Sequence, residues 1–136
     1  MTPTYLLDTN ICIYIAKQQP PGVLRRFTGL ITDEIGMSLI TYGELRYGAS
    51  KSQAWEKVLK KLESLQRHIP VLPLFPAVAD HYGDIRATLE RQGIPIGNND
   101  LWIAAHARAL GVTLVSNNLR EFQRVENLAL ENWADS

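Results

Sequence analysis

The sequence has one cysteine, Cys12, among its 136 residues. One cysteine cannot form an internal disulfide or build a cysteine-rich zinc site, so neither device holds this fold together. We expect Cys12 to be a small core side chain in a reducing compartment. The three histidines are far apart, and neither His-x-Glu nor His-Glu-x-x-His occurs. Histidine-based metal centres of those types are therefore excluded as well.

The chain also lacks an excess of charge of either sign. It has 14 Lys and Arg against 14 Asp and Glu, so no overall field draws it to nucleic acid or membrane, and binding RNA would need a local basic face. No apolar run approaches the roughly 20 residues of a membrane-spanning helix, and the N-terminus does not read as a signal peptide. With 46% hydrophobic residues, the sequence predicts a single soluble, cytoplasmic domain over residues 1–136.

Short apolar runs alternate with helical patterns along the chain. The predicted strands cover residues 5–7, 35–39, 69–74, 112–115 and 128–131. The predicted helices cover residues 10–17, 41–48, 52–66, 76–89 and 100–110, with one more helical turn over 23–29. This alternation is typical of a parallel sheet covered by helices on both faces, and so of an α/β fold.

Polar side chains stand where predicted strands or loops lead into helices. Asp8 and Ser116 each follow a predicted strand by one residue, and Glu44 and Asp100 lie near the starts of predicted helices. In open parallel sheets, ligands bind beyond the carboxyl ends of the strands. The fold would have to bring these residues together for them to form one site.

Each acidic residue also has a purely structural explanation. Asp8 fits a helix N-cap, Thr41-x-x-Glu44 has the pattern of a capping box, and Asp100 complements the dipole of its helix. Glu121 fits a surface ion pair with a neighbouring arginine. If the carboxylates gather at one rim, however, they repel one another unless a cation lies between them. Mg²⁺ suits such a rim because it binds a few carboxylates, keeps its waters and bridges to phosphate.

Four stretches of the sequence are informative in combination: "YLLDTN", "SLITYGELRYGA", "IPIGNNDLWIAAHARALGVTLVSNN" and "REFQRVENLALENW". Together, and in this order, they resemble the VapC-type toxins of the PIN-domain ribonuclease family, over almost the whole chain from Tyr5 to Trp133. The resemblance implies a three-layer α/β/α sandwich with a central, mainly parallel sheet. It also implies an acidic pocket and a Mg²⁺-dependent endoribonuclease activity, with Mn²⁺ as the other usable ion.

The resemblance assigns roles to individual residues. Asp8, Glu44 and Asp100 look like the carboxylates of a catalytic metal site, while Asn10 and Ser116 are candidates to support them. First-shell ligands of a metal need such supporting hydrogen bonds.

Family members usually carry a fourth acid in the turn after the strand that ends near residue 116. In this sequence the position falls either on Asn118 or on Glu121, which stands just before the Phe. We favour Glu121 as a fourth catalytic residue, with Asn118 supporting it. An asparagine at residue 118 argues against a strong second metal site.

The resemblance also implies a substrate and partners. Related toxins cut RNA in single-stranded loops, and we expect a tRNA anticodon loop, with the initiator tRNA favoured. Tyr14, Tyr47 and Trp102 are able to stack on unpaired bases, although core packing is the more common role for such residues. The residues that bind substrate are otherwise left open. A cognate VapB-type antitoxin is the implied inhibitor, and a homodimer is the implied assembly.

Two other readings compete with the nuclease. An aspartyl nucleophile of a phosphoryl-transfer enzyme would fit Asp8, but that class typically has a second Asp two positions on, where this chain has Asn10. The stronger alternative is a PIN-like module that binds RNA or protein with weak or no catalysis. Asn118 favours it, whereas the intact Asp8, Glu44 and Asp100 oppose it.

Overall fold

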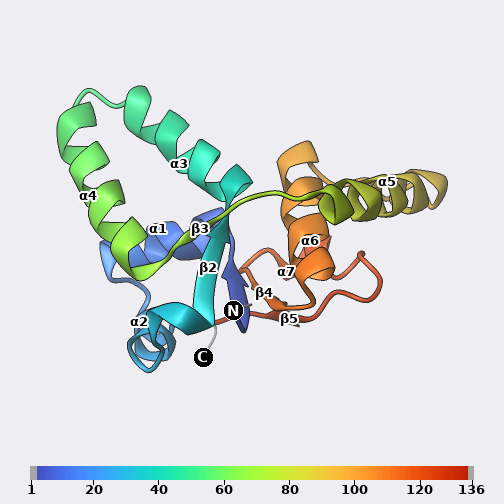
Figure 1. Cartoon of the computed structure of the whole chain (residues 1–136), viewed down its shortest axis with the longest axis horizontal. Helices are drawn as coiled ribbons and strands as arrows, with labels where there is room; N and C mark the ends of the chain where they lie inside the picture. Colours follow the sequence, from blue (N-terminus) through green and yellow to red (C-terminus); the bar gives the residue numbers. More distant parts are fainter. Residues whose placement is uncertain (1–2, 135–136) are drawn as a thin grey trace.

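The computed structural model describes residues 3–134. Within them, the strands form one parallel sheet in the order β3-β2-β1-β4-β5 (Figure 1). The strands are β1 (Tyr5–Leu7), β2 (Ile35–Ser38), β3 (Val71–Leu72), β4 (Thr113–Val115) and β5 (Leu130–Glu131). All lie where the sequence predicts them. The third is much shorter than expected because Pro70 and Pro73 flank it, and proline has no N–H to donate to a ladder.

The helices also lie where the sequence predicts them, apart from two short additions. They are α1 (Thr9–Lys17), α2 (Pro21–Thr28), α3 (Leu39–Ser50), α4 (Trp55–His68), α5 (Pro76–Arg91), α6 (Asn98–Leu110) and the four-residue α7 (Leu119–Phe122), with a 3₁₀ turn η1 (Thr32–Glu34). Neither α7 nor η1 is predicted from the sequence. Across the described stretch, no helix is both long and apolar enough to cross a membrane.

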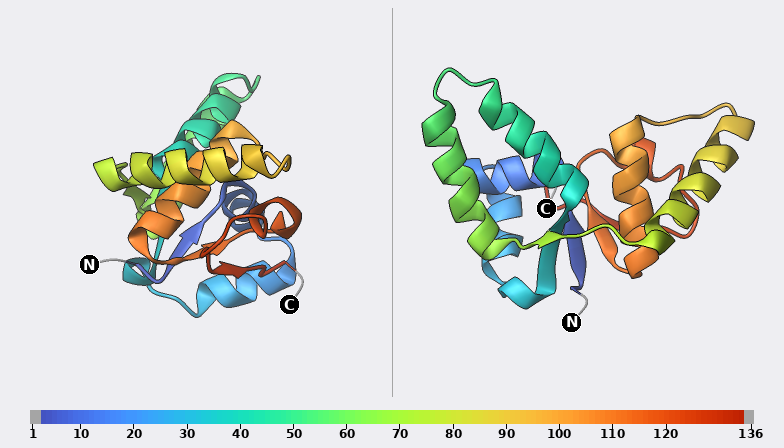
Figure 2. Two further views of the ribbon diagram at one scale, coloured as in Figure 1. Left: turned by 90° about the vertical axis from the view of Figure 1, so that its right-hand side faces the viewer. Right: turned by 45° about the horizontal axis from the view of Figure 1, so that its top comes forward.

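Two neighbouring residues of β1 show how the layers are built. Leu6 and Leu7 are both fully buried and belong to different cores, because successive side chains of a strand point to opposite faces. Leu6 packs with α5 and α6, and Leu7 packs with α1, α2 and α4. The helices therefore cover both faces of the sheet (Figure 2), which confirms the predicted α/β/α architecture. Cys12 is fully buried in the second core, as expected, and burial raises the pKa of its thiol.

The start of α3 differs from the prediction. The helix begins at Leu39 rather than near Thr41, and its N-cap is Ser38, whose Oγ accepts a hydrogen bond from the Ile40 N–H at 3.1 Å. The predicted capping box of Thr41 and Glu44 is therefore wrong: Thr41 lies inside the helix, and Glu44 is available for other contacts. Because Ser38 is at once the last residue of β2 and the cap of α3, no loop separates the two elements.

Candidate active site

The centre of the candidate site is the carboxyl edge of the sheet between β1 and β4. Leu7 pairs with Val115 in the parallel register, and the Asp8 N–H donates to the Val115 carbonyl at 3.0 Å. Asp8 and Ser116 are therefore side by side, and the Ser116 hydroxyl hydrogen-bonds the Asp8 carboxylate. Both residues are buried. Asp8 and Ser116 are thus neighbours at the carboxyl edge of the sheet, as their positions after two predicted strands indicate.

Asp8 has a structural and an electrostatic role at the same time. Its Oδ1 accepts a hydrogen bond from the Ile11 N–H at 3.0 Å and so caps α1. Burial nevertheless raises its pKa from 3.8 to about 6, although the Ser116 and Ile11 hydrogen bonds oppose the shift, and the negative charge of Glu44 raises it further. The hydrogen bond that caps α1 therefore does not by itself offset the cost of burying the charged Asp8 carboxylate.

Glu44 reaches the same site from α3. Its Oε1 accepts from the Thr9 hydroxyl at 2.5 Å, and its Oε2 accepts from the Asn99 amide at 3.4 Å. These two partners tie the first turns of α1 and α6 to α3. Neither residue stands out in the sequence except by its position directly beside Asp8 or Asp100.

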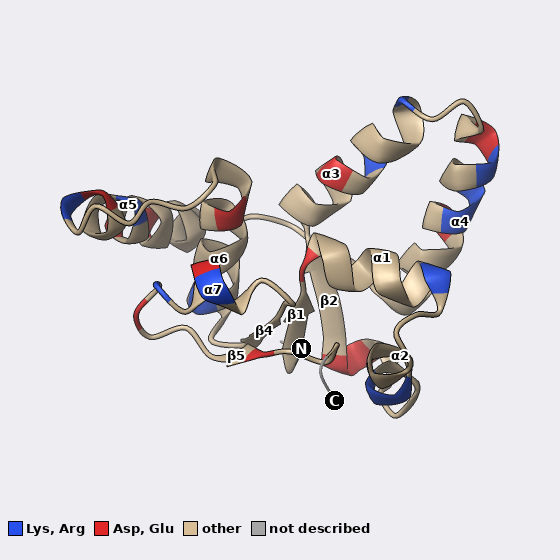
Figure 3. Cartoon of the chain, turned by 180° about the vertical axis from the view of Figure 1, so that it is seen from behind, with Lys and Arg blue, Asp and Glu red and all other residues tan. Residues whose placement is uncertain are grey.

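Asp100 and Glu121 form a carboxyl pair. Their side chains are hydrogen-bonded, and the pKa of Asp100 is raised to about 7 by burial first, then by Glu121, and then by the charges of Glu44 and Asp8. A carboxyl group surrounded by other acids releases its proton less readily than a free one, because its charged form is repelled by these neighbours. In Figure 3 the acidic segments of α3, α6, α7 and the β1–α1 junction surround one region.

Glu121 and Asn118, the two candidates for the fourth position of the site, make different contacts. Glu121 lies against Asp100, whereas the Asn118 side-chain amide donates to Glu121 Oε2 at 3.1 Å. The Asn118 N–H donates to Ser116 Oγ at 2.9 Å. This arrangement agrees with Glu121 as the acid and Asn118 as its support. The catalytic role of both residues stays a prediction.

Asn10 is hydrogen-bonded to the loop after β4. Its side-chain amide donates to Asn117 Oδ1 at 3.4 Å, and the Asn117 amide donates to the Tyr14 hydroxyl at 2.6 Å. This chain of bonds connects α1 to that loop beside the carboxylates, so the support that Asn10 gives to the site is indirect. Thr9 and Asn99 contact Glu44 directly.

Comparison with known proteins identifies the family. Residues 5–128 match the model of the PIN domain. The chain belongs to the PIN-domain family. It is 44% identical over 130 residues to Ribonuclease VapC1 of Haemophilus influenzae (strain R2866), with 95% of this chain and 97% of that protein covered. It is 46% identical over 130 residues to the tRNA(fMet)-specific endonuclease VapC of Shigella flexneri, with 96% and 98% covered.

A solved structure places this PIN domain in the VapC group as well. The crystal structure of DNA-bound VapBC from Salmonella typhimurium contains a chain that superposes with a TM-score of 0.90 at 42% identity, over 96% of this chain and 98% of that one. The family and the fold inferred from the four sequence stretches are thereby confirmed.

The donor set of this PIN domain fits a hard, hydrated cation. Among residues 3–134, no three His, Cys, Asp or Glu side chains stand close enough to hold an ion by themselves. Mg²⁺ does not require three, because it typically binds one or two carboxylates and completes its octahedron with waters and substrate phosphate. The raised pKa values of Asp8 and Asp100 mark uncompensated negative charge that a cation would neutralise.

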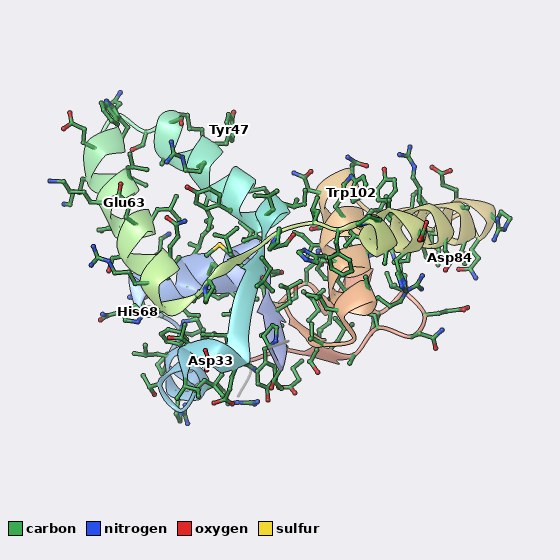
Figure 4. All side chains as sticks on the ribbon, in the orientation of Figure 1. Asp33, Tyr47, Glu63, His68, Asp84 and Trp102 are labelled. Carbon is green, nitrogen blue, oxygen red and sulfur yellow. The ribbon has the colours of Figure 1, made fainter. Side chains whose placement is uncertain are left out.

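The aromatic residues singled out in the sequence have different environments. The Tyr14 hydroxyl is hydrogen-bonded to Asn117. Trp102 lies on the side of α6 that faces α5 and stacks on Tyr82, with the ring centroids 3.9 Å apart. Tyr47 is 66% exposed and points outward from α3 (Figure 4). Of the three, Tyr47 alone presents most of its ring to solvent.

Proposed function

We propose that this PIN domain is a metal-dependent endoribonuclease toxin that hydrolyses a phosphodiester bond in a tRNA anticodon loop, with the initiator tRNA favoured. The observation that carries the proposal is the mutual electrostatic influence of Asp8, Glu44, Asp100 and Glu121, which come from four separate segments. Relatives named as a ribonuclease and as a tRNA(fMet)-specific endonuclease support the reaction and the substrate.

Asp8 would be the central ligand of Mg²⁺ or Mn²⁺, with Glu44 and Asp100 either binding the ion directly or holding its waters. Such an ion, when bound, lowers the pKa of water and stabilises developing charge on the leaving oxygen. Hydrogen bonds from the chain position two of these carboxylates. The Ile11 N–H and Ser116 orient Asp8, and Thr9 with Asn99 orients Glu44. Fixing the ligands beforehand reduces the reorganisation that the reaction requires.

Glu121 is suited to accept the proton of the attacking water. It lies against Asp100, and a carboxylate next to the ion-binding acids can serve as a general base. Asn118, which donates to Glu121 Oε2, keeps that carboxylate turned toward Asp100.

The inhibitor of this toxin is proposed to be a cognate VapB-type antitoxin. Structures of VapBC complexes from three organisms match this chain with TM-scores of 0.88 to 0.90, which supports such a partner. An arginine of the antitoxin placed among the carboxylates would supply the positive charge that the ion supplies otherwise. We further propose a homodimer that acts in the cytoplasm, where its tRNA substrate is found.

The test is incubation of purified protein with total tRNA in Mg²⁺, in Mn²⁺ and in EDTA, beside the Asp8→Asn variant. Discrete fragments that require both the metal and Asp8 are the expected result. Fragments that form equally in EDTA, or with Asp8→Asn, would overturn the metal-site assignment. If both tRNA and ribosomal RNA remain intact, the PIN-like binding module without catalysis becomes the better description.

A further inference from the structure

A buried histidine connects the two helices that carry Glu44 and Asp100. His106 lies on α6, six residues after Asp100, and is fully buried. Its Nδ1 is 2.8 Å from Ser38 Oγ. Its Nε2 makes no hydrogen bond of good geometry within residues 3–134, and the Pro73 carbonyl near the ring only partly opposes the lowering of its pKa by burial. The bond to Ser38 is therefore the well-formed polar contact that holds this buried ring.

Ser38 uses both of its hydrogen-bonding functions in this contact. Its Oγ accepts the Ile40 N–H and thereby caps α3. Its own hydroxyl hydrogen is then available to donate to His106 Nδ1, provided that the ring is neutral. Burial lowers the pKa of His106, which favours the neutral ring.

The contact adds a polar link between α6 and a helix that packs mainly on the other side of the sheet. The buried apolar residues of α6 pack with Leu6, and Ile40 at the start of α3 reaches this same core. Farther along α3, Tyr42 and Leu45 pack with Leu7 on the other side. The α3–α4 and α5–α6 pairs extend from the sheet in different directions (Figure 1). Few polar contacts cross between α3 and α6, and the other one near the site is the longer, exposed bond from Asn99 to Glu44.

We propose that His106 is a positioning residue, which through Ser38 fixes the first turn of α3 against α6 and so sets the distance between Glu44 and Asp100. This inference rests on the proposed function, because the geometry matters for catalysis only if these carboxylates form the nuclease site. His106 itself touches neither the carboxylates nor, by its burial, the RNA. Its effect is therefore expected on catalysis and on ion binding rather than on RNA affinity.

The test compares a substitution that keeps an acceptor near the Nδ1 position with substitutions that remove the hydrogen bond. His106→Asn retains an amide oxygen near Nδ1, whereas His106→Leu fills similar space without it, and Ser38→Ala removes the bond from the other side. We measure kcat and KM on tRNA, and the affinity for Mn²⁺ alone by calorimetry. His106→Leu and Ser38→Ala are expected to lower kcat and weaken Mn²⁺ binding about tenfold or more, with KM little changed, and His106→Asn is expected to restore most of both.

A packing control separates positioning from a general loss of stability. Ile103→Val removes one methylene from the same helix at a fully packed position and should lower the melting temperature while leaving kcat and Mn²⁺ affinity unchanged. The proposal is overturned if His106→Leu and Ser38→Ala keep wild-type kcat and Mn²⁺ affinity, or if His106→Asn fails as badly as His106→Leu. If the wild type cleaves no RNA, the proposed function fails, and the Mn²⁺ affinities alone still decide whether His106 positions the carboxylates.

Discussion

Asp8 caps α1 through the Ile11 N–H and is also a buried carboxylate whose pKa is raised from 3.8 to about 6. At pH 7.5 and without metal, this residue is ionised in the folded protein at a cost of about 3 kcal/mol, since one pKa unit is about 1.4 kcal/mol. Asparagine caps helices as well as aspartate does and carries no charge. We therefore expect Asp8→Asn to be more stable than the wild type in EDTA by about 1–3 kcal/mol, yet inactive.

Denaturant unfolding at pH 7.5 in EDTA measures this difference in stability, and cleavage of tRNA in Mg²⁺ measures the activity. A variant that unfolds at lower denaturant than the wild type would show that the carboxylate stabilises the metal-free fold. In that case burial would not raise the pKa of Asp8.

Glu121 and Asn118 make different kinds of contact, and their substitutions should differ accordingly. Glu121→Gln removes the carboxylate beside Asp100 that we propose as the general base, so we expect kcat to fall on the order of a hundredfold. Asn118→Ala removes one hydrogen bond to Glu121 but leaves the Asp100 contact, so its loss should be smaller. Steady-state cleavage of tRNA ranks the two. The reverse order would place the fourth position of the site at Asn118.

Helix α6 carries Asp100 at its start and ends at Gly111, whose φ of 71° lies in the left-handed region. A side chain there is strained by roughly 1–2 kcal/mol, although nothing would contact an added Cβ. Gly111→Ala should therefore lower the free energy of unfolding by about 1 kcal/mol without changing kcat, because the strain arises at the far end of the helix from the site.

Gly83 provides the matched control for this prediction. It lies inside α5 without a positive φ, and nothing would contact an added Cβ. Gly83→Ala should stabilise the protein by up to about 1 kcal/mol. Thermal unfolding of both variants distinguishes backbone conformation from a general effect of adding a methyl group. Equal shifts in the same direction would contradict the account.

At the scale of the elements, the sequence predicted those helices and strands that have a visible hydrophobic pattern. The helices of nine residues or more show an apolar stripe, and the strands stand out as short apolar runs between turns. The four residues of α7 are too few for any period to be visible. The start of α3 was misplaced because Ser38 serves as both strand end and helix cap, so no turn residues marked the boundary.

The sequence predicted the carboxylates of the candidate site and two of their supporting residues, Ser116 and Asn118, but not the partners of Glu44. Asp8, Glu44 and Asp100 lie within recognisable stretches of sequence. Thr9 and Asn99 hold Glu44 from 35 and 55 residues away, and single polar residues show no periodicity that would reveal such pairings. The structure was needed because the contact depends on how α1, α3 and α6 meet.

At the scale of the whole molecule, the clustered carboxylates should make the metal-free protein less stable as pH rises. Both shifted groups have raised pKa values, about 6 for Asp8 and about 7 for Asp100, against 3.8. Between pH 4 and 7 the folded state therefore holds more protons than the unfolded state, and raising the pH lowers the free energy of unfolding through this window.

Thermal unfolding in EDTA from pH 4.5 to pH 8 should show this decline once any background trend of the Asp8→Asn variant is subtracted. Added Mg²⁺ should raise the melting temperature at pH 8 much more than at pH 5, because the ion competes with protons for the same oxygens. A melting temperature that rises with pH in EDTA, or a Mg²⁺ effect equal at both pH values, would contradict the assignment.

The central strand β1 pairs with β4, so that Leu7 lies opposite Val115. The Asp100 carboxyl interacts with Glu121, which follows it in the chain. Along the chain, Asp8 and Glu44 come before Asp100 and Glu121, and β4 follows most of the helices. During translation β1 can pair with β2 early, whereas the site stays incomplete until the segment that carries Glu121 has left the ribosome. For a toxin that attacks tRNA, as proposed, a partly synthesised chain is therefore unable to cleave the tRNAs of the ribosome that is making it.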